Sequence, residues 1–398
     1  AGVGTFVYLL FTKFKSPVFL GSSFAFIGSM NAAFAGAVSV QAGFAGLLIG
    51  AILAGLVYAI IAIVVKKAGV SWIDKLMPPV VIGPTVAIIG LSLASSAIGN
   101  LSKSDVTGGT TNFAVLCGLV ALIATTLAST YGKKYTKMIP FIIGILSGYA
   151  LAAVLTLIGN ATGVESLMIS DFSAFTNLAS GGVTLSTFFS VPDFTFLTAA
   201  KGFSQVDAGY IGTVAVAYIP VAFVVFAEHI ADHKNISSII EKDLLKDPGL
   251  DRTLLGDGIG SIVGAFFGGC PNTTYGESVA CVAITKNASV ATIITAAIEC
   301  IVLAFISPIV AFISSIPSCV MGGVCMALYG FIAVSGLKMV QKVDLEQNKN
   351  LFVVSSILIA GIGGLQLSFG KITITSIACA LILGIIVNKL LSKDPSAK

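Results

Sequence analysis

The residues best suited to chemistry in this chain are a few ionisable side chains inside long apolar stretches. Glu228 lies within VVFAEHIADHK, with His229 beside it, Asp232 four residues further on, and then His233. Residues four apart share one face of a helix, so Glu228 and Asp232 are expected to face each other. Two neighbouring carboxylates resist ionising together, and burial acts in the same direction, so at least one is expected to hold a proton more readily than usual. The cluster favours proton transfer, with a solvated helix end as the alternative for Glu228, Asp232 and the two histidines.

A second carboxylate, Glu277, lies in the polar segment PNTTYGESVACVAITK at 271–286, between apolar stretches. It follows Gly276 directly, where extended backbone is expected to become helix. A helix N-terminus offers free N–H groups, and a carboxylate there can accept a hydrogen bond from a ligand N–H; a cap of its own helix is the alternative. Asp257 lies at the start of another predicted span, where it is expected to be either a helix cap or a functional carboxylate. Glu299 is expected to make a structural hydrogen bond inside the helix bundle.

Other kinds of chemistry lack their sequence patterns. The chain has no G-x-S-x-G, no H-E-x-x-H and no phosphate-binding loop, and its two histidines make a histidine-based metal site improbable. The seven cysteines show no C-x-x-C pair and are expected to be small core residues. The sequence therefore predicts a protein that is not an enzyme, with no cofactor and no metal.

The composition is that of an integral membrane protein. Of 398 residues, 56% are hydrophobic and only 10% are charged, whereas soluble domains carry about 25% charged residues. Apolar stretches near the roughly 20 residues that span a bilayer recur along the chain. About thirteen spans are predicted, at 1–11, 18–36, 43–65, 79–98, 113–131, 139–158, 209–230, 254–268, 272–285, 289–312, 316–334, 351–367 and 372–390.

The basic residues lie almost entirely on one side of this predicted topology. If successive spans alternate in direction, one set of loops holds 19 of the 22 basic residues. The other set holds only Lys103, Lys201 and Lys371. By the positive-inside rule the lysine-rich side is cytoplasmic, and the C-terminus lies on it. The net charge of +4 follows from these loops and requires no nucleic acid as a partner.

Two of the predicted spans are interrupted. The segments 17–36 and 268–286 each begin as an extended run and continue as a helix of small residues. Non-helical backbone at membrane depth persists only where it is buried in protein or lines a cavity. Interrupted segments in corresponding positions of two halves indicate the binding site of a transporter, with two kinked helices as the alternative. The halves are predicted at 1–158 and 209–398, joined by an extracellular connection at 159–208.

The first of these halves is one helix short. Span 1–11 is also short, and the total number of spans is odd. We therefore expect the biological protein to extend N-terminally by about 30–50 residues that carry one more helix of roughly 20 residues.

Several short motifs resemble the nucleobase–ascorbate transporter family, and within it the bacterial uracil permeases. The resemblance runs in order over essentially the whole chain. Its motifs are GSSFAFI (21–27), AEH (227–229), KDLLKDPGL (242–250), PNTTYGE (271–277), AIT (283–285), and MGGV and LYG within 321–330.

The resemblance implies an all-α membrane fold of fourteen spans in two inverted repeats of seven. A short strand lies in each broken span, and the repeats form a core and a gate domain. It also implies proton-coupled uptake of uracil or a related base in the inner membrane of a bacterium. The expected partners are the base, protons and the lipid bilayer, with a homodimer as one assembly to test.

The same resemblance assigns site residues. The expected substrate-binding positions are Phe24, Glu228, Tyr275, Gly276, Glu277 and Tyr329, with Phe24 and Gly276 acting through backbone amides. The expected proton-coupling residues are Glu228, Asp232 and His233.

Two positions depart from the uracil permease pattern and leave the exact base open. Asp232 replaces the histidine usual in that branch, as in many purine-transporting relatives. Ser278-Val279-Ala280 replaces the family's usual Asn-x-Gly. A xanthine or other purine permease is therefore one alternative. Two further alternatives belong to other classes. One is a sulfate-type anion carrier, which would need a cationic site within the spans. The other is an intramembrane enzyme that uses Glu228, His229 and Asp232.

Overall fold

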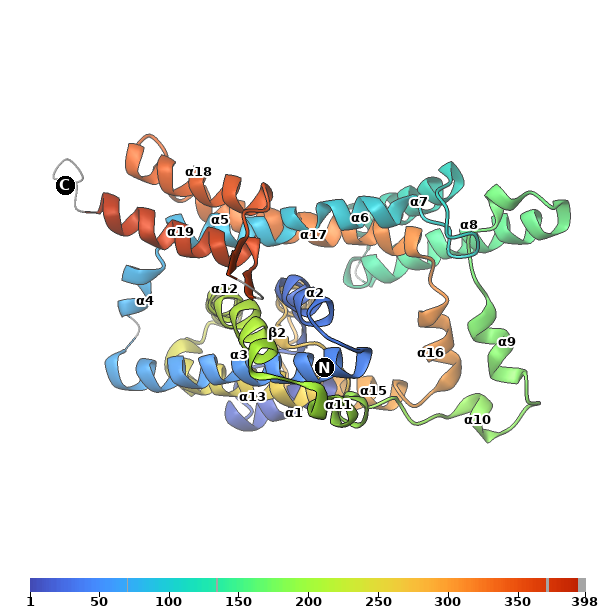
Figure 1. Ribbon diagram of the computed structural model, residues 1–398, viewed down its shortest axis with the longest axis horizontal. Helices are drawn as coiled ribbons and strands as arrows, with labels where there is room; N and C mark the ends of the chain where they lie inside the picture. Colours follow the sequence, from blue (N-terminus) through green and yellow to red (C-terminus); the bar gives the residue numbers. More distant parts are fainter. Residues whose placement is uncertain (70, 134, 370–371, 393–398) are drawn as a thin grey trace. The chain divides into compact units, whose positions relative to one another are not determined.

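The computed structural model describes residues 1–69, 71–133, 135–369 and 372–392. The chain is mainly helical and forms two compact units (Figure 1). The first unit combines Ala1–Ile89, Asp193–Ile301 and Val334–Lys398, and the second combines Gly90–Pro192 and Val302–Ala333. Each of the predicted spans overlaps at least one helix, and those at 18–36, 272–285 and 372–390 also contain a strand. The predicted division into sequence repeats stays a prediction.

The first unit contains most of the helices and all the named strands. Its helical elements are α1 (Gly2–Phe11), η1 (Phe24–Phe26), α2 (Ile27–Ala35), α3 (Val40–Ala68), α4 (Ser71–Leu76), α11 (Thr195–Gly202), η4 (Phe203–Gln205), α12 (Ala208–Ile240), η5 (Leu245–Gly249), α13 (Leu250–Phe266), α14 (Gly276–Thr285), α18 (Asn348–Ile362) and α19 (Ser376–Leu391). Its strands are β1 (Leu20–Ser22), β2 (Asn272–Thr274), β3 (Leu367–Phe369) and β4 (Ile372–Ile374).

The second unit is built around a helical hairpin of α7 and α8. Its elements are α6 (Ala94–Leu101), α7 (Asn112–Tyr131), η2 (Thr136–Met138), α8 (Pro140–Thr162), η3 (Glu165–Leu167), α9 (Ser173–Ala179), α10 (Leu185–Phe188) and α16 (Ser307–Ser314). Three helices contribute residues to both units, namely α5 (Pro79–Ser92), α15 (Val290–Leu303) and α17 (Ser318–Val340).

Many of the helices are suited to a membrane. Six helical stretches in the described part of the chain are long and apolar enough to cross one, and five shorter apolar helices accompany them. The longest, α12, has 33 residues, which corresponds to about 50 Å at 1.5 Å per residue. This length exceeds the roughly 30 Å of a hydrocarbon core, so one end of α12 extends beyond it.

The two interrupted spans form strands, as predicted, and the strands pair with each other. β1 and β2 are antiparallel, with Leu20 opposite Thr274, Gly21 opposite Thr273 and Ser22 opposite Asn272. Residues 250 positions apart thus satisfy each other's backbone groups, which neither segment could do alone at membrane depth. A second hairpin, β3–β4, was not predicted. It follows α18, which ends at Ile362, before Gly364 adopts a φ of +73°.

Side chains from neighbouring helices complete the hydrogen bonding of this strand pair. The Leu20 amide donates to Thr5 Oγ1 of α1 over 3.0 Å. On the other strand, Ser261 Oγ of α13 donates to the carbonyl oxygen of Asn272 over 2.5 Å. All four residues are buried or nearly so. The strands are therefore fixed to the first unit by specific polar contacts.

Small residues allow the helices around the strands to approach closely. α3, α12 and α13 pack together beside β2 (Figure 1). A Cβ atom built on Gly258 of α13 would lie 2.8 Å from Tyr58 Cβ and 3.0 Å from the carbonyl oxygen of Gly55, both in α3. Gly258 is therefore required by the close helix contact, as in many membrane helix pairs.

We expect Gly258→Ala to destabilise the protein by about 1–3 kcal/mol, because the added methyl group would push α3 and α13 apart. The measurement is a thermal melt of the purified protein in detergent. Gly99→Ala in α6 is the matched control, since a Cβ there meets no atom within 4 Å, and alanine favours helix by up to about 1 kcal/mol. Equal melting temperatures for the two variants would show that the α3–α13 contact tolerates a side chain.

Candidate functional site

Helix α12 carries the predicted carboxylates and histidines at residues 228–233. The helix continues to Ile240, ten residues beyond the predicted end of the span, so the alternative of a solvated helix end at residues 228–233 is wrong. Glu228 is partly buried, Asp232 is 7% exposed, and both histidines are fully buried. Asp232 Oδ2 accepts a hydrogen bond of 2.8 Å from Thr274 Oγ1, at the end of β2. Asp232 thereby links α12 directly to the second broken segment.

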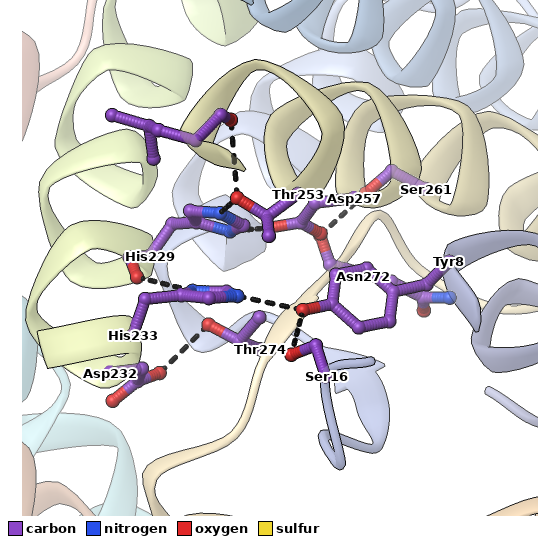
Figure 2. A network of polar contacts seen from close by, with 11 residues as sticks. Tyr8, Ser16, His229, Asp232, His233, Thr253, Asp257, Ser261, Asn272 and Thr274 are labelled. Carbon is purple, nitrogen blue, oxygen red and sulfur yellow. Dashed lines mark hydrogen bonds and ion pairs between the residues drawn. The ribbon is translucent and has the colours of Figure 1, made fainter. Parts of the chain in front are cut away.

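The two histidine rings are stacked one helical turn apart. Their centroids lie 4.0 Å apart with an interplanar angle of 27°. His233 Nδ1 lies 2.8 Å from the carbonyl oxygen of His229, and because a carbonyl only accepts, Nδ1 must donate. In the neutral ring, Nε2 then accepts from the Tyr8 hydroxyl over 2.7 Å, and Tyr8 in turn accepts from Ser16 over 2.6 Å (Figure 2). This chain of bonds leads from α12 to α1.

His229 belongs to a second chain of bonds, which ends on α13. Its Nε2 lies 3.0 Å from Thr253 Oγ1, which donates its own hydrogen to the carbonyl oxygen of Leu250 over 3.1 Å. Thr253 must therefore accept from His229 Nε2. Nδ1 lies 2.7 Å from Asp257 Oδ2, so a single proton occupies the space between these two atoms (Figure 2). Since the pair is fully buried, this proton has no direct contact with solvent.

This geometry corrects the expectations for two other carboxylates. Asp257 lies in the interior of α13, seven residues after its first residue Leu250, so it is not a helix cap. Sequence reasoning missed the pairing, although a Thr–Asp pair and a His–His pair, each four residues apart, were visible signals. Glu299 is exposed on α15 and not buried in the bundle, so the expected internal hydrogen bond is wrong.

The first broken segment meets the second at Tyr275. The Tyr275 hydroxyl donates to the carbonyl oxygen of Ser22 over 2.8 Å. A side chain at Gly21 would collide with the Tyr275 ring, so the glycine makes room for it. Phe24 follows in η1, partly buried, and the Ser23 amide donates to the carbonyl oxygen of Pro271 over 2.9 Å. Tyr275 thus holds the two segments in register just before each becomes helical.

The start of α14 is the accessible part of this arrangement. Gly276 is its first residue and is exposed. A Cβ atom on Gly276 would lie 3.6 Å from Asp232 Oδ1. Helix N-termini present backbone N–H groups that are free of intrahelical partners, so a polar ligand can meet amide donors and a carboxylate here.

The remaining predicted residues are placed less fully. Glu277 lies in the first turn of α14, but its side chain is outside the part of the chain that the structure describes. Tyr329 is 9% exposed and belongs to the second unit. The first unit therefore brings together Phe24, Tyr275 and Gly276 at the broken segments. Among the described residues there is no group of three or more histidine, cysteine or acidic side chains that could hold a metal ion.

Solved structures of other transporters share this fold. The transmembrane domain of a cyanobacterium bicarbonate transporter, BicA, aligns with a TM-score of 0.56 at 14% identity, over 98% of this chain and 88% of that chain. The structure of SLC26A9 aligns with a TM-score of 0.55 at 12% identity, over 98% of this chain and 60% of that chain. At such low identity these similarities establish the fold alone.

Sequence relatives are much more similar. The uracil permease of Bacillus caldolyticus is 37% identical over 401 residues, covering 100% of this chain and 85% of the relative. The uracil permease of Escherichia coli strain K12 is 34% identical, covering 98% of this chain and 84% of the relative. A putative pyrimidine permease of the same strain, RutG, is 32% identical over 99% of this chain and 82% of its own length. Residues 1–369 also match the sequence profile of the permease family, and the chain, a multi-pass membrane protein, belongs to that family.

Proposed function

We propose that this protein is a symporter that carries uracil across the inner membrane of a bacterium together with protons. The observation that carries the proposal is the pairing of two broken membrane segments beside the carboxylate-bearing face of α12. Several relatives that span nearly the whole chain are named uracil permeases. In this proposal the fourteen-span plan with inverted repeats applies, and the lysine-rich side and the C-terminus face the cytoplasm.

The chemistry of a neutral base fits this site. Uracil has no charge and presents alternating N–H and C=O groups along its edge. Backbone N–H groups at the start of α14 and near Phe24 can donate to the carbonyls, and the carboxylates of Glu228 and Glu277 can accept from the N–H groups. Buried polar groups of a ligand need such partners, because each unsatisfied one costs about 1–3 kcal/mol.

Proton coupling is proposed to act through Glu228. A protonated Glu228 can donate to a carbonyl of the base, so that bound base favours the proton and, by linkage, the proton favours the base. Asp232 shares the same helix face one turn away and contacts Thr274, so its charge acts on both Glu228 and the strand. Both ring nitrogens of His233 are hydrogen-bonded, one to Tyr8 and one to a carbonyl of its own helix. We therefore propose that His233 acts on the carboxylates indirectly.

A purine permease is the competing assignment, because Asp232 is the residue found in many purine-transporting relatives. A thermal-shift screen of the purified protein against uracil, xanthine and other bases distinguishes the two. A ligand that binds the native state raises the melting temperature according to its concentration relative to Kd. Stabilisation by xanthine without stabilisation by uracil would reassign the substrate.

We expect Glu277→Gln to weaken uracil binding at least tenfold. The amide keeps the shape of the side chain but replaces an acceptor oxygen with a donor, which opposes a ligand N–H. Loss of a charge-assisted hydrogen bond costs about 1.5–3 kcal/mol. Isothermal titration of folded protein measures the effect, and Glu299→Gln on the exposed face of α15 serves as the control. Equal uracil affinity in both variants would exclude Glu277 from the binding site.

We expect Glu228→Gln to retain part of the uracil binding but to lose accumulation driven by a proton gradient, because glutamine imitates the protonated acid permanently. Glu228→Ala is expected to lose both. The assay is uptake of labelled uracil into proteoliposomes with and without an inward proton gradient.

The comparison variant in this assay is Asp232→Asn, which is expected to shift the pH dependence of uptake without abolishing binding. If Glu228→Gln still concentrates uracil in response to the gradient, the coupling residue lies elsewhere, and Asp232 is tested next.

A further inference from the structure

A cavity rich in lysines lies at the end of α12 beyond the proposed binding site. Its volume is about 740 Å³, within the range of about 300–1,000 Å³ that is typical of small-molecule pockets. All the residues that line it belong to the first unit. Its polar lining residues are Lys234 and Asn235 of α12, and Ser335, Lys338, Gln341 and Lys342 in and just after the last turns of α17.

The cavity continues the face of α12 that carries the proposed coupling carboxylate. Ala231 and Asn235, which line it, lie three and seven residues after Glu228. Residues with this spacing share one helix face. On the opposite wall, Ser335, Lys338 and Lys342 follow the same spacing. The cavity is thus about one to two helical turns from Glu228.

The charge of the cavity has one sign. None of the described residues that line it carries a carboxylate, and within the described chain none of its three lysines forms an ion pair. The positive-inside rule explains why lysines occur on this side of the membrane, but it does not require three of them around one cavity without a counter-charge. All three lysines are exposed and line the same cavity, so an anionic occupant would meet positive charge from more than one side.

The walls favour a soluble anion over a lipid. Apart from the polar residues, the cavity is lined only by Pro79, Ala231 and Met339. A second lysine-lined cavity of about 710 Å³ has Leu76, Val80 and Ile385 in its wall, which suits an acyl chain. Leucine, valine and isoleucine are not among the described residues that line the cavity on α12.

We propose that this cavity binds the phosphate group of a nucleoside monophosphate, on the side predicted to be cytoplasmic. A phosphate monoester carries about −1.5 to −2 charges at pH 7 and three acceptor oxygens. Three lysines and three neutral donors match these oxygens, and lysine is an effective point-charge ligand for phosphate. The base of such a nucleotide would lie toward Glu228, so the occupant would obstruct release of the transported base. This last step rests on the proposed function; the anion site itself does not.

The test is titration of uridine monophosphate against the full chain in nanodiscs of neutral phosphatidylcholine, in a buffer without phosphate. The triple variant Lys234→Gln, Lys338→Gln, Lys342→Gln is expected to raise the Kd at least tenfold. The matched control Lys75→Gln, Lys349→Gln, Lys389→Gln removes the same charge from the other cavity and is expected to leave the Kd unchanged. Inorganic phosphate is expected to compete, whereas uridine, which lacks the phosphate, is not.

Three outcomes would overturn the proposal: no binding of the nucleotide at millimolar concentration, equal loss in both triple variants, or competition by uridine as strong as by phosphate. A lipid occupant is a fourth. It would appear as stabilisation by phosphatidylglycerol that is lost in the first triple variant, without nucleotide binding. Uracil binding measured on the same samples tests the proposed function separately, because neither triple variant alters the residues proposed to bind the base.

Discussion

The arrangement of the first unit depends on one constraint, which is that backbone groups inside a membrane must find partners within the protein. Segments 20–22 and 272–274 leave the helical conformation and lose their local hydrogen bonds. They recover them from each other and from Thr5 and Ser261 on the adjoining helices. Because each partner is supplied by a different part of the chain, α1, α13 and the two broken segments must assemble together.

The buried polar network beside the strands depends on the same need for hydrogen-bond partners within the protein. Six side chains from α1, α12 and α13 and their connections lie within two chains of hydrogen bonds: Tyr8, Ser16, His229, His233, Thr253 and Asp257. The contacts of this network link α12 to α1 and α13, and buried hydrogen bonds of this kind fix the rotation of α12 about its axis. This rotation places the Asp232 side chain against Thr274. The histidines therefore position the carboxylate face of α12.

Three sets of lysines in the described part of the chain differ in what surrounds them. Lys15 pairs with Asp247 at 2.6 Å, in an exposed ion pair of small energetic value. The lysines on α4, α18 and α19 line a cavity with an apolar wall. Those on α12 and in or just after α17 line a cavity in which no described lining residue carries a carboxylate. Lysines in this chain thus lie in surroundings with different chemical capacity.

The sequence alone determined the membrane class, the positions of the spans and the interruption of two of them, because these follow from local composition and from the cost of burying charge in lipid. It also identified Glu228 and Glu277 as candidate functional carboxylates, because an acidic side chain inside an apolar stretch is costly to bury. Tertiary structure alone decided which partners these and other polar residues have. Asp257 proved to be the partner of His229 and not a cap, Glu299 proved to be exposed, and residues 228–233 proved to lie inside a continuous helix. The physical reason is that helix periodicity relates residues within one segment, whereas pairing between segments depends on how helices distant in sequence rotate and pack.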